Sequence, residues 1–154
     1  MGEIVCSATH PGSGRVAVVA AEGDSMWLYL SAPGQGGIAG DCWLANTGPA
    51  LPRADLRPRA EAYRRRGAPP PAPREVVAVD AQAGRPVPAA AALGFRWTAD
   101  GEGVAVLLDG ALWGLIAPGA RRGASRDLVV EGPWGAPLDP ELARTLFGLP
   151  AAAP

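Results

Sequence analysis

The stretch GVAVLLDGALWGLIA, residues Gly103–Ala117, holds the clearest fold signal in the chain. Two short apolar runs flank the pair Asp109-Gly110. An Asp-Gly pair in this setting is a strong hairpin signal, because a tight two-residue turn requires positive φ at both of its central positions. The stretch therefore predicts two antiparallel strands, Gly103–Leu108 and Ala111–Ala117.

Similar segments occur on both sides of this hairpin. They are short, rich in Val and Leu, and separated by Gly, Pro and Asp, a pattern typical of strands. The further predicted strands are Arg15–Ala21, Met26–Ala32, Gly36–Asn46, Glu75–Asp80, Gly94–Thr98 and Arg126–Val130. The first three of these would form an antiparallel meander. The predicted fold class is α+β, dominated by antiparallel β-sheet in two meander-like halves.

The segment Gly48–Arg74 differs in composition, because it is rich in Pro and Arg. The run Pro69-Pro70-Pro71 must be extended, since Pro fixes φ and donates no hydrogen bond. A short helix is predicted over Leu56–Arg66. We expect the whole segment to be an exposed connector between the two sheet-forming halves.

The chain end carries a helix signal over Pro140–Phe147. Asp139 precedes it as an N-cap, Pro140 occupies the first helical position, and Gly148 ends the helix. The predicted buried stripe consists of Leu142, Leu146 and Phe147.

The length of 154 residues suits one domain. We expect a single domain over residues 1–150, with halves at about 1–47 and 75–148, a connector at 48–74 and a tail at 151–154.

Composition argues against several functional classes. The net charge of −1 does not favour nucleic-acid binding, and no apolar run approaches the roughly 20 residues of a membrane span. One His and two separated Cys residues cannot supply a closed zinc site. The Gly-rich stretches at 12–17 and 34–39 precede strand patterns, so no cofactor is predicted. Without a secretory signal or a disulfide framework, we expect a cytoplasmic protein.

The segment Gln35–Ala45 resembles the nucleophile segment of calpain-type cysteine proteases, in which Gly-Asp-Cys-Trp follows Gln-Gly. That chemistry requires a thiolate and a His base. The only His, His10, precedes Cys42 instead of following it, and one extra residue interrupts the pattern. A cysteine hydrolase at Cys42 is therefore the weakest of three functional hypotheses. The alternative is that Cys42 and Trp43 lie on a strand, with one side chain facing in and the other facing out.

The chain contains five Trp residues, and at least three are expected in the core. The others are candidates for a partner-binding surface, because Trp and Arg are frequent anchors at interfaces. Trp134 lies in a segment rich in Gly and Pro, where core packing explains a large side chain less easily. The predicted partner-binding residues are Arg96, Trp97, Arg126, Asp127 and Trp134.

Four stretches together resemble a family of small uncharacterised bacterial proteins. These stretches are Gly40–Asn46, Asp100–Gly119, Arg126-Asp127 and Gly132-Pro133. In size and architecture that family is similar to the immunity proteins of polymorphic-toxin systems. The resemblance implies a non-catalytic module that binds a protein partner, most concretely a toxin that it neutralises. The second hypothesis is a small-molecule-binding or accessory domain that uses a cleft between the two halves.

Overall fold

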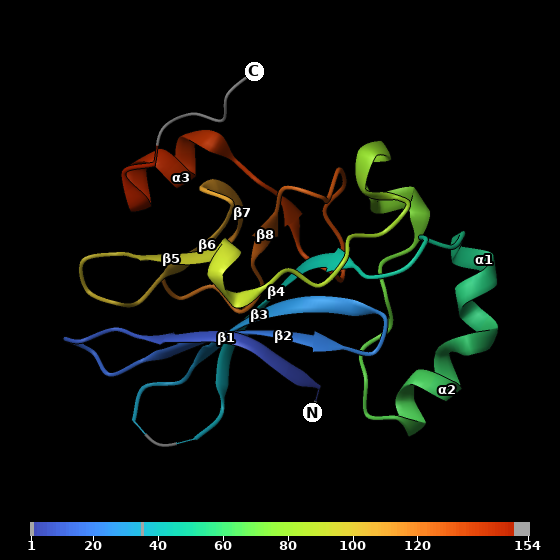
Figure 1. Ribbon diagram of the computed structural model, residues 1–154, viewed down its shortest axis with the longest axis horizontal. Coiled ribbons are helices and arrows are strands. Elements are labelled where there is room, and N and C mark those ends of the chain that lie inside the picture. Colours follow the sequence, from blue (N-terminus) through green and yellow to red (C-terminus); the bar gives the residue numbers. More distant parts are fainter. Residues whose placement is uncertain (1, 35, 150–154) are drawn as a thin grey trace.

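The computed structural model of the chain describes residues 2–34 and 36–149. Two β-sheets dominate it, with short helices between and after them (Figure 1). The strands are β1 (Glu3–Thr9), β2 (Val16–Glu22), β3 (Ser25–Ser31), β4 (Ile38–Asn46), β5 (Leu93–Trp97), β6 (Val104–Leu108), β7 (Ala111–Ile116), β8 (Ala124–Ser125) and β9 (Ala136–Pro137). The α-helices are α1 (Arg53–Leu56), α2 (Ala60–Arg65) and α3 (Pro140–Phe147). The α+β class with mainly antiparallel sheet is thus confirmed.

The first sheet is an antiparallel meander in the order β1-β2-β3-β4. A tight turn joins β2 to β3, with Glu22 opposite Ser25 and Gly23 at φ +59°. The predicted hairpin and the third strand are therefore confirmed. The edge strand β1 had no clear sequence signal, because it is the most exposed strand of this sheet and its apolar residues do not alternate cleanly.

The second sheet has the order β5-β6-β7-β8-β9. The turn between β6 and β7 has Asp109 at φ +50° and Gly110 at φ +82°, which is the conformation that the Asp-Gly pair predicts. The strands β5 to β8 are antiparallel, and the two-residue strands β8 and β9 pair in parallel.

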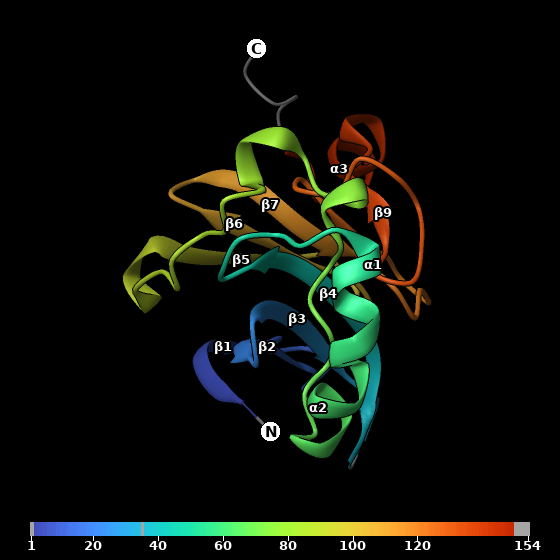
Figure 2. The ribbon, with the colours of Figure 1, turned by 90° about the vertical axis from the view of Figure 1, so that its right-hand side faces the viewer.

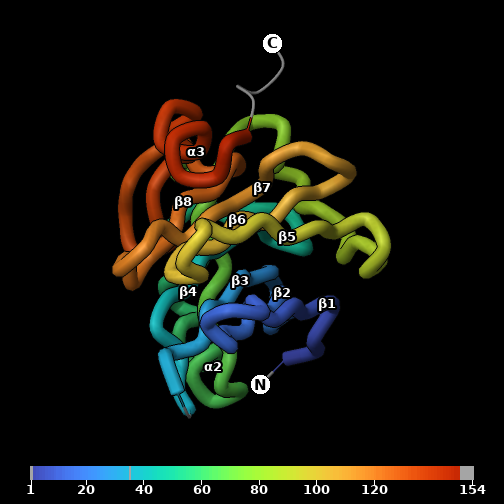
Figure 3. The backbone as a smooth tube through the Cα atoms, turned by 90° about the vertical axis from the view of Figure 1, so that its left-hand side faces the viewer, coloured from blue at the N-terminus to red at the C-terminus, as the bar shows by residue number. Residues whose placement is uncertain are grey.

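The two sheets pack face to face and share a hydrophobic core, as Figures 2 and 3 show from opposite sides. Leu28 and Cys42 of the first sheet meet Val106 and Trp113 of the second within this cluster. Packed apolar side chains occupy the space between the two facing sheet surfaces.

The outer face of the second sheet is covered by α3, whose boundaries agree with the prediction. Asp139 caps the helix by accepting a hydrogen bond from the backbone N–H of Glu141, and Gly148 ends it at φ +65°. The predicted buried stripe needs correction. Leu142 is 40% exposed, and Ala143 and Phe147 form the buried contact. The tail at 151–154 and Gln35 lie outside the described residues.

The connector covers the outer face of the first sheet, so the prediction of a fully exposed segment is wrong (Figure 2). The predicted helix divides into α1, a 3₁₀ turn at Arg57–Arg59, and α2. After it, the extended chain buries Pro71, Ala72 and Pro73. Ala72 belongs to a second hydrophobic cluster that contains Trp27 and Trp43 of the sheet. Proline-rich chain suits this position because it makes apolar contacts while leaving few N–H groups without partners.

Two predicted strands are absent. The segment Glu75–Asp80 contains 3₁₀ turns at Arg74–Val76 and Val79–Ala81 instead. The segment Arg126–Val130 turns away after β8, because Ser125 Oγ accepts the backbone N–H of Asp127. The two segments touch at one isolated bridge, between Val77 and Leu128. Val76, Val77 and Leu128 are buried in the cluster beneath the connector, whereas Val79, Val129 and Val130 are exposed.

None of the helices in the described part of the chain has the length and apolar character needed to cross a membrane.

Candidate partner-binding site

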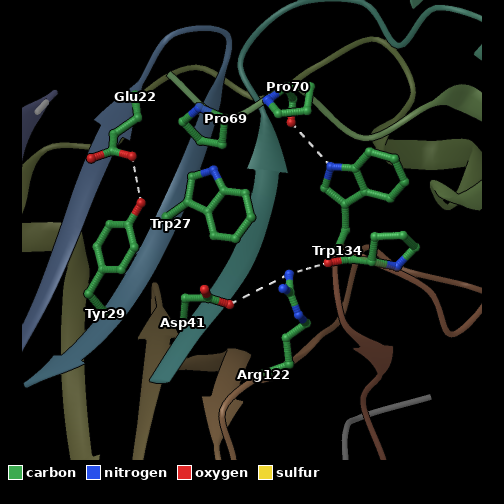
Figure 4. Close-up of a pocket in the computed structure, with 9 residues that line it drawn as sticks. Glu22, Trp27, Tyr29, Asp41, Pro69, Pro70, Arg122 and Trp134 are labelled. Carbon is green, nitrogen blue, oxygen red and sulfur yellow. Dashed lines mark hydrogen bonds and ion pairs between the residues drawn. The ribbon is translucent and has the colours of Figure 1, made fainter. Parts of the chain in front are cut away.

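A pocket of about 340 Å³ opens at the outer face of the first sheet (Figure 4). It lies where the sheet, the connector and the segments before and after β8 meet. Its lining residues are Glu22, Trp27, Tyr29, Asp41, Pro69, Pro70, Arg122, Pro133 and Trp134. The pocket is therefore assembled from five parts of the sequence, at residues 22–29, 41, 69–70, 122 and 133–134.

The sheet supplies an aromatic base. Trp27 and Tyr29 are two residues apart on β3, so their side chains project from the same face. Their rings lie 6.2 Å apart with an angle of 10° between the planes. The Trp27 indole N–H donates a hydrogen bond to Ser25 Oγ at 2.9 Å, which fixes the ring. The base is consequently rigid and largely apolar.

The opposite wall consists of Trp134 and two prolines of the connector. The Trp134 indole N–H donates a hydrogen bond to the carbonyl oxygen of Pro70 at 3.1 Å, as the dashed line in Figure 4 shows. Trp134 is partly buried and packs against the cluster beneath the connector. It therefore fastens the loop to the connector and also presents aromatic surface to the pocket.

Three charged side chains border the aromatic surfaces. Arg122 Nη1 lies 3.9 Å from Asp41 Oδ1 and also donates a hydrogen bond to the carbonyl oxygen of Pro133. Burial raises the pKa of the Asp41 carboxyl, and the nearby guanidinium groups of Arg122 and Arg121 oppose this increase. The Tyr29 hydroxyl donates to Glu22 Oε2 at 2.5 Å. Burial, followed by this hydrogen bond, raises the pKa of Tyr29 well above its usual value.

The position of the connector wall depends on a hydrogen-bonded latch at Asn46. The Asn46 side chain accepts the backbone N–H of Ala72 at 2.9 Å and donates to the carbonyl oxygen of Ala72 at 2.8 Å. Its oxygen also accepts the indole N–H of Trp43 at 3.1 Å. Asn46 is 2% exposed and Ala72 is fully buried. One side chain thus pairs with the connector in the way a neighbouring strand would.

The five predicted partner-binding residues do not lie together in the structure. Trp134 alone lines the pocket. Trp97 lies against His10, with ring centroids 5.4 Å apart, and Arg96 beside it on β5 is exposed. Arg126 is partly exposed, and its Nε lies 3.7 Å from Oδ1 of the neighbouring Asp127.

The interpretation of Asp127 as a surface residue is corrected. Its side chain is 1% exposed and forms a two-pronged ion pair with Arg85, at 2.5 Å and 2.9 Å. This pairing raises the pKa of Arg85. Because Asp127 neutralises a cation inside the fold, it cannot contact a partner without rearrangement.

Sequence reasoning missed five charged or aromatic lining residues: Glu22, Trp27, Tyr29, Asp41 and Arg122. Tyr29 carried a weak signal, since it alternates with buried residues on β3 and so shares a face with Trp27. For Asp41 and Arg122 the sequence contained no such signal. They meet only because the backbone of β4 pairs with the segment before β8.

Cys42 lies on β4 in the core between the sheets, while Trp43 is buried beneath the connector on the opposite face. Burial raises the pKa of the Cys42 thiol to about 12. The thiol donates to the carbonyl oxygen of Ala124 at 3.3 Å. Over the described ranges, no group of three or more His, Cys, Asp or Glu side chains is arranged to hold a metal ion.

Comparisons of the chain with protein-family models, with curated proteins and with solved structures gave no match.

Proposed function

We propose that the chain is a non-catalytic protein-binding module and that the pocket of Figure 4 receives an anchoring side chain of the partner. The observation that supports this proposal is the arrangement of three aromatic side chains, Trp27, Tyr29 and Trp134, around one open pocket of about 340 Å³. Aromatic pockets with polar rims are common centres of binding energy at protein interfaces.

The framework of the pocket suits recognition without large rearrangement. The base is part of a four-stranded sheet buried on its inner face, and the wall is fixed by the Trp134 hydrogen bond and the Asn46 latch. A preformed pocket lowers the entropic cost of association. The more specific proposal, supported by the family resemblance of the sequence, is that the partner is a toxin and that binding neutralises it.

The test is to produce the chain together with the protein encoded beside its gene. We expect the neighbouring protein to inhibit growth, the chain to restore growth, and the purified pair to form a stoichiometric complex by calorimetry. Trp134→Phe retains an aromatic ring and serves as the control for Trp134→Ala. The alanine variant should weaken the complex by about 2 kcal/mol or more. A harmless neighbour, or one that does not bind, contradicts the toxin-neutralising proposal.

A small-molecule-binding function is the second candidate, because the pocket volume falls within the range of about 300–1,000 Å³ typical of ligand sites. Its lining comes from both sequence halves, at residues 22–41 and 122–134, and from the connector, which is compatible with a ligand site between the halves. A metabolite retained through purification, displaced by the Trp134→Ala substitution and detected by mass spectrometry, would favour this candidate over a protein partner.

A further inference from the structure

We propose that the pocket accepts a cationic side chain of the partner, the guanidinium group of Arg or the ammonium group of Lys. This inference rests on the proposed protein-binding function and specifies the chemistry of the anchor. It follows from the aromatic faces of the pocket, its charge and its hydrogen-bond acceptors, which are considered in turn.

The aromatic faces favour a cation. Trp27 and Tyr29 form one side of the pocket, and Trp134 faces them across the opening (Figure 4). The faces of aromatic rings carry negative electrostatic potential and attract Arg and Lys head groups, with Trp as the strongest partner. Aromatic surfaces on two sides would enclose a cationic head group while its aliphatic stem extends toward the opening.

The charge of the lining residues also favours a cation. Glu22 and Asp41 contribute two carboxylates, and Arg122 contributes one guanidinium, so the lining carries a net charge of −1 when all three are ionised. Arg121 lies beside Asp41 but does not line the pocket. The arrival of one positive charge would neutralise the lining, whereas an anion would increase its excess negative charge.

The hydrogen-bond acceptors of the pocket already contact one guanidinium group. The guanidinium of Arg122 lies beside Asp41 and donates to the carbonyl oxygen of Pro133. Asp41 Oδ1 is buried, and no described residue forms a hydrogen bond with it. The Asp41 side chain as a whole is 32% exposed, so its carboxylate can accept a hydrogen bond from a partner. The carbonyl oxygens of Pro70 and Pro133 each accept one hydrogen bond and have a second lone pair. A partner guanidinium or ammonium group would therefore find both charge and acceptors in place.

The anion alternative has less support. Arg122 is the one cationic lining residue, and its Nη1 is already engaged by a carbonyl oxygen and lies close to a carboxylate. An anionic ligand would have to compete with these interactions and approach Glu22 and Asp41. We therefore assign the pocket to cations.

The experiment uses the full chain and four blocked tripeptides with the central residue Arg, Lys, Glu or Leu. Binding is followed through the indole N–H signals in nuclear magnetic resonance spectra. Trp27 and Trp134 report on the pocket, and Trp113 in the core between the sheets is the reference. We expect the Arg or Lys peptide to shift the two pocket signals in a saturable manner, while the Trp113 signal remains unchanged. The stronger of the two cationic peptides identifies the preferred head group.

Asp41→Asn tests the charge contribution, and Asp55→Asn on α1 is the matched control with the same change in net charge. Asp41→Asn should weaken binding of the cationic peptide about fivefold or more, because a charge-assisted contact is replaced by a neutral one. The variant should remain at least as stable as the parent at neutral pH, since burial already disfavours the charged form of Asp41. Asp55→Asn should leave binding unchanged.

The inference is wrong if the Glu or Leu peptide shifts the pocket signals as strongly as the Arg peptide. It is also wrong if no cationic peptide binds or if Asp41→Asn binds with unaltered affinity. The proposed function is judged separately, through the effect of Trp134→Ala on the partner complex. A complex that requires Trp134, together with a pocket that ignores cations, would retain the function and reject only the cationic anchor.

Discussion

Replacement of Asn46 by Leu should be among the most destabilising single changes in the chain, although the two side chains have the same number of non-hydrogen atoms and both branch at Cγ. Asn46 makes three buried hydrogen bonds, two with the backbone of Ala72 and one with the indole of Trp43. Leu would leave the Ala72 N–H, the Ala72 carbonyl and the Trp43 N–H without partners. Each unsatisfied buried group costs about 1–3 kcal/mol.

The full sum of these costs is an upper bound, because the connector can move outward and admit water. We therefore expect Asn46→Leu to lower the free energy of unfolding by about 3–5 kcal/mol, which corresponds to a decrease in Tm of roughly 10–15 °C for a domain of this size. That loss is large compared with the total of about 5–15 kcal/mol typical of a folded domain.

Urea denaturation followed by tryptophan fluorescence would measure this loss. Thr47→Val is the matched control, because the Thr47 hydroxyl makes no hydrogen bond with a described residue, and its effect should be below about 1 kcal/mol. Adding Trp43→Phe to Asn46→Leu removes one of the three orphaned groups, so the double variant should lose less than the sum of the two single effects. An Asn46→Leu protein within 1 kcal/mol of the parent would refute the latch.

Three further predictions concern other parts of the fold. Asp127→Ala should lower the free energy of unfolding, measured by urea denaturation, by about 3 kcal/mol, because it leaves the partly buried guanidinium of Arg85 without its main partner. Asp80→Ala removes a carboxylate that is 83% exposed and should lower it by less than about 1 kcal/mol. Equal losses would show that Asp127 is not the main partner of Arg85. The Cys42 thiol, with its pKa raised to about 12 by burial, should resist a disulfide reagent at pH 8 and react only when urea unfolds the chain. Because Cys6 is also free and only partly buried, the measurement uses a Cys6→Ser variant, and rapid labelling of that variant in its native state would show that the core opens readily. Limited trypsin digestion should cut first at Arg64–Arg66, which is exposed at the end of α2, and a first cut at Arg96 within the second sheet would be incompatible with the structure.

The parts of the fold that were predictable depend on local backbone chemistry. The Asp109-Gly110 turn requires positive φ at two adjacent residues, and few residue pairs satisfy that requirement. Likewise, α3 begins after a capping Asp139 and ends at Gly148 in the left-handed conformation. Such signals are contained within a few residues, so the sequence displays them directly.

The parts that were not predictable depend on what covers each face of a sheet. Cys42 and Trp43 alternate on β4, and alternation normally implies one buried and one exposed side chain. Both are in fact buried, because the connector covers the face from which Trp43 projects. The Pro and Arg content of the connector predicted an exposed segment. Its extended part is in fact buried against two Trp rings, which composition alone does not reveal.

For the same reason, only part of the candidate site could be predicted from the sequence. Trp134 was recognisable because a large aromatic residue stood in a loop rich in Gly and Pro. Its neighbours across the pocket come from β3, β4 and the connector, and no local pattern joins them. Asp127 shows the opposite error. Its Arg-Asp sequence resembled a surface pair, yet its partner is the distant Arg85.

The order in which the pocket is completed has a consequence during protein synthesis. Trp27 and Tyr29 are made early, but Trp134 is added only after most of the chain. At a translation rate of about 5–20 residues per second, the interval between Trp27 and Trp134 is roughly 5–20 s. Once residue 46 has been made, a nascent chain in that interval contains all four strands of the first sheet, yet its aromatic base has no facing wall. Incomplete chains should therefore not bind the proposed partner, because the complete pocket exists only in molecules that have been synthesised beyond Trp134.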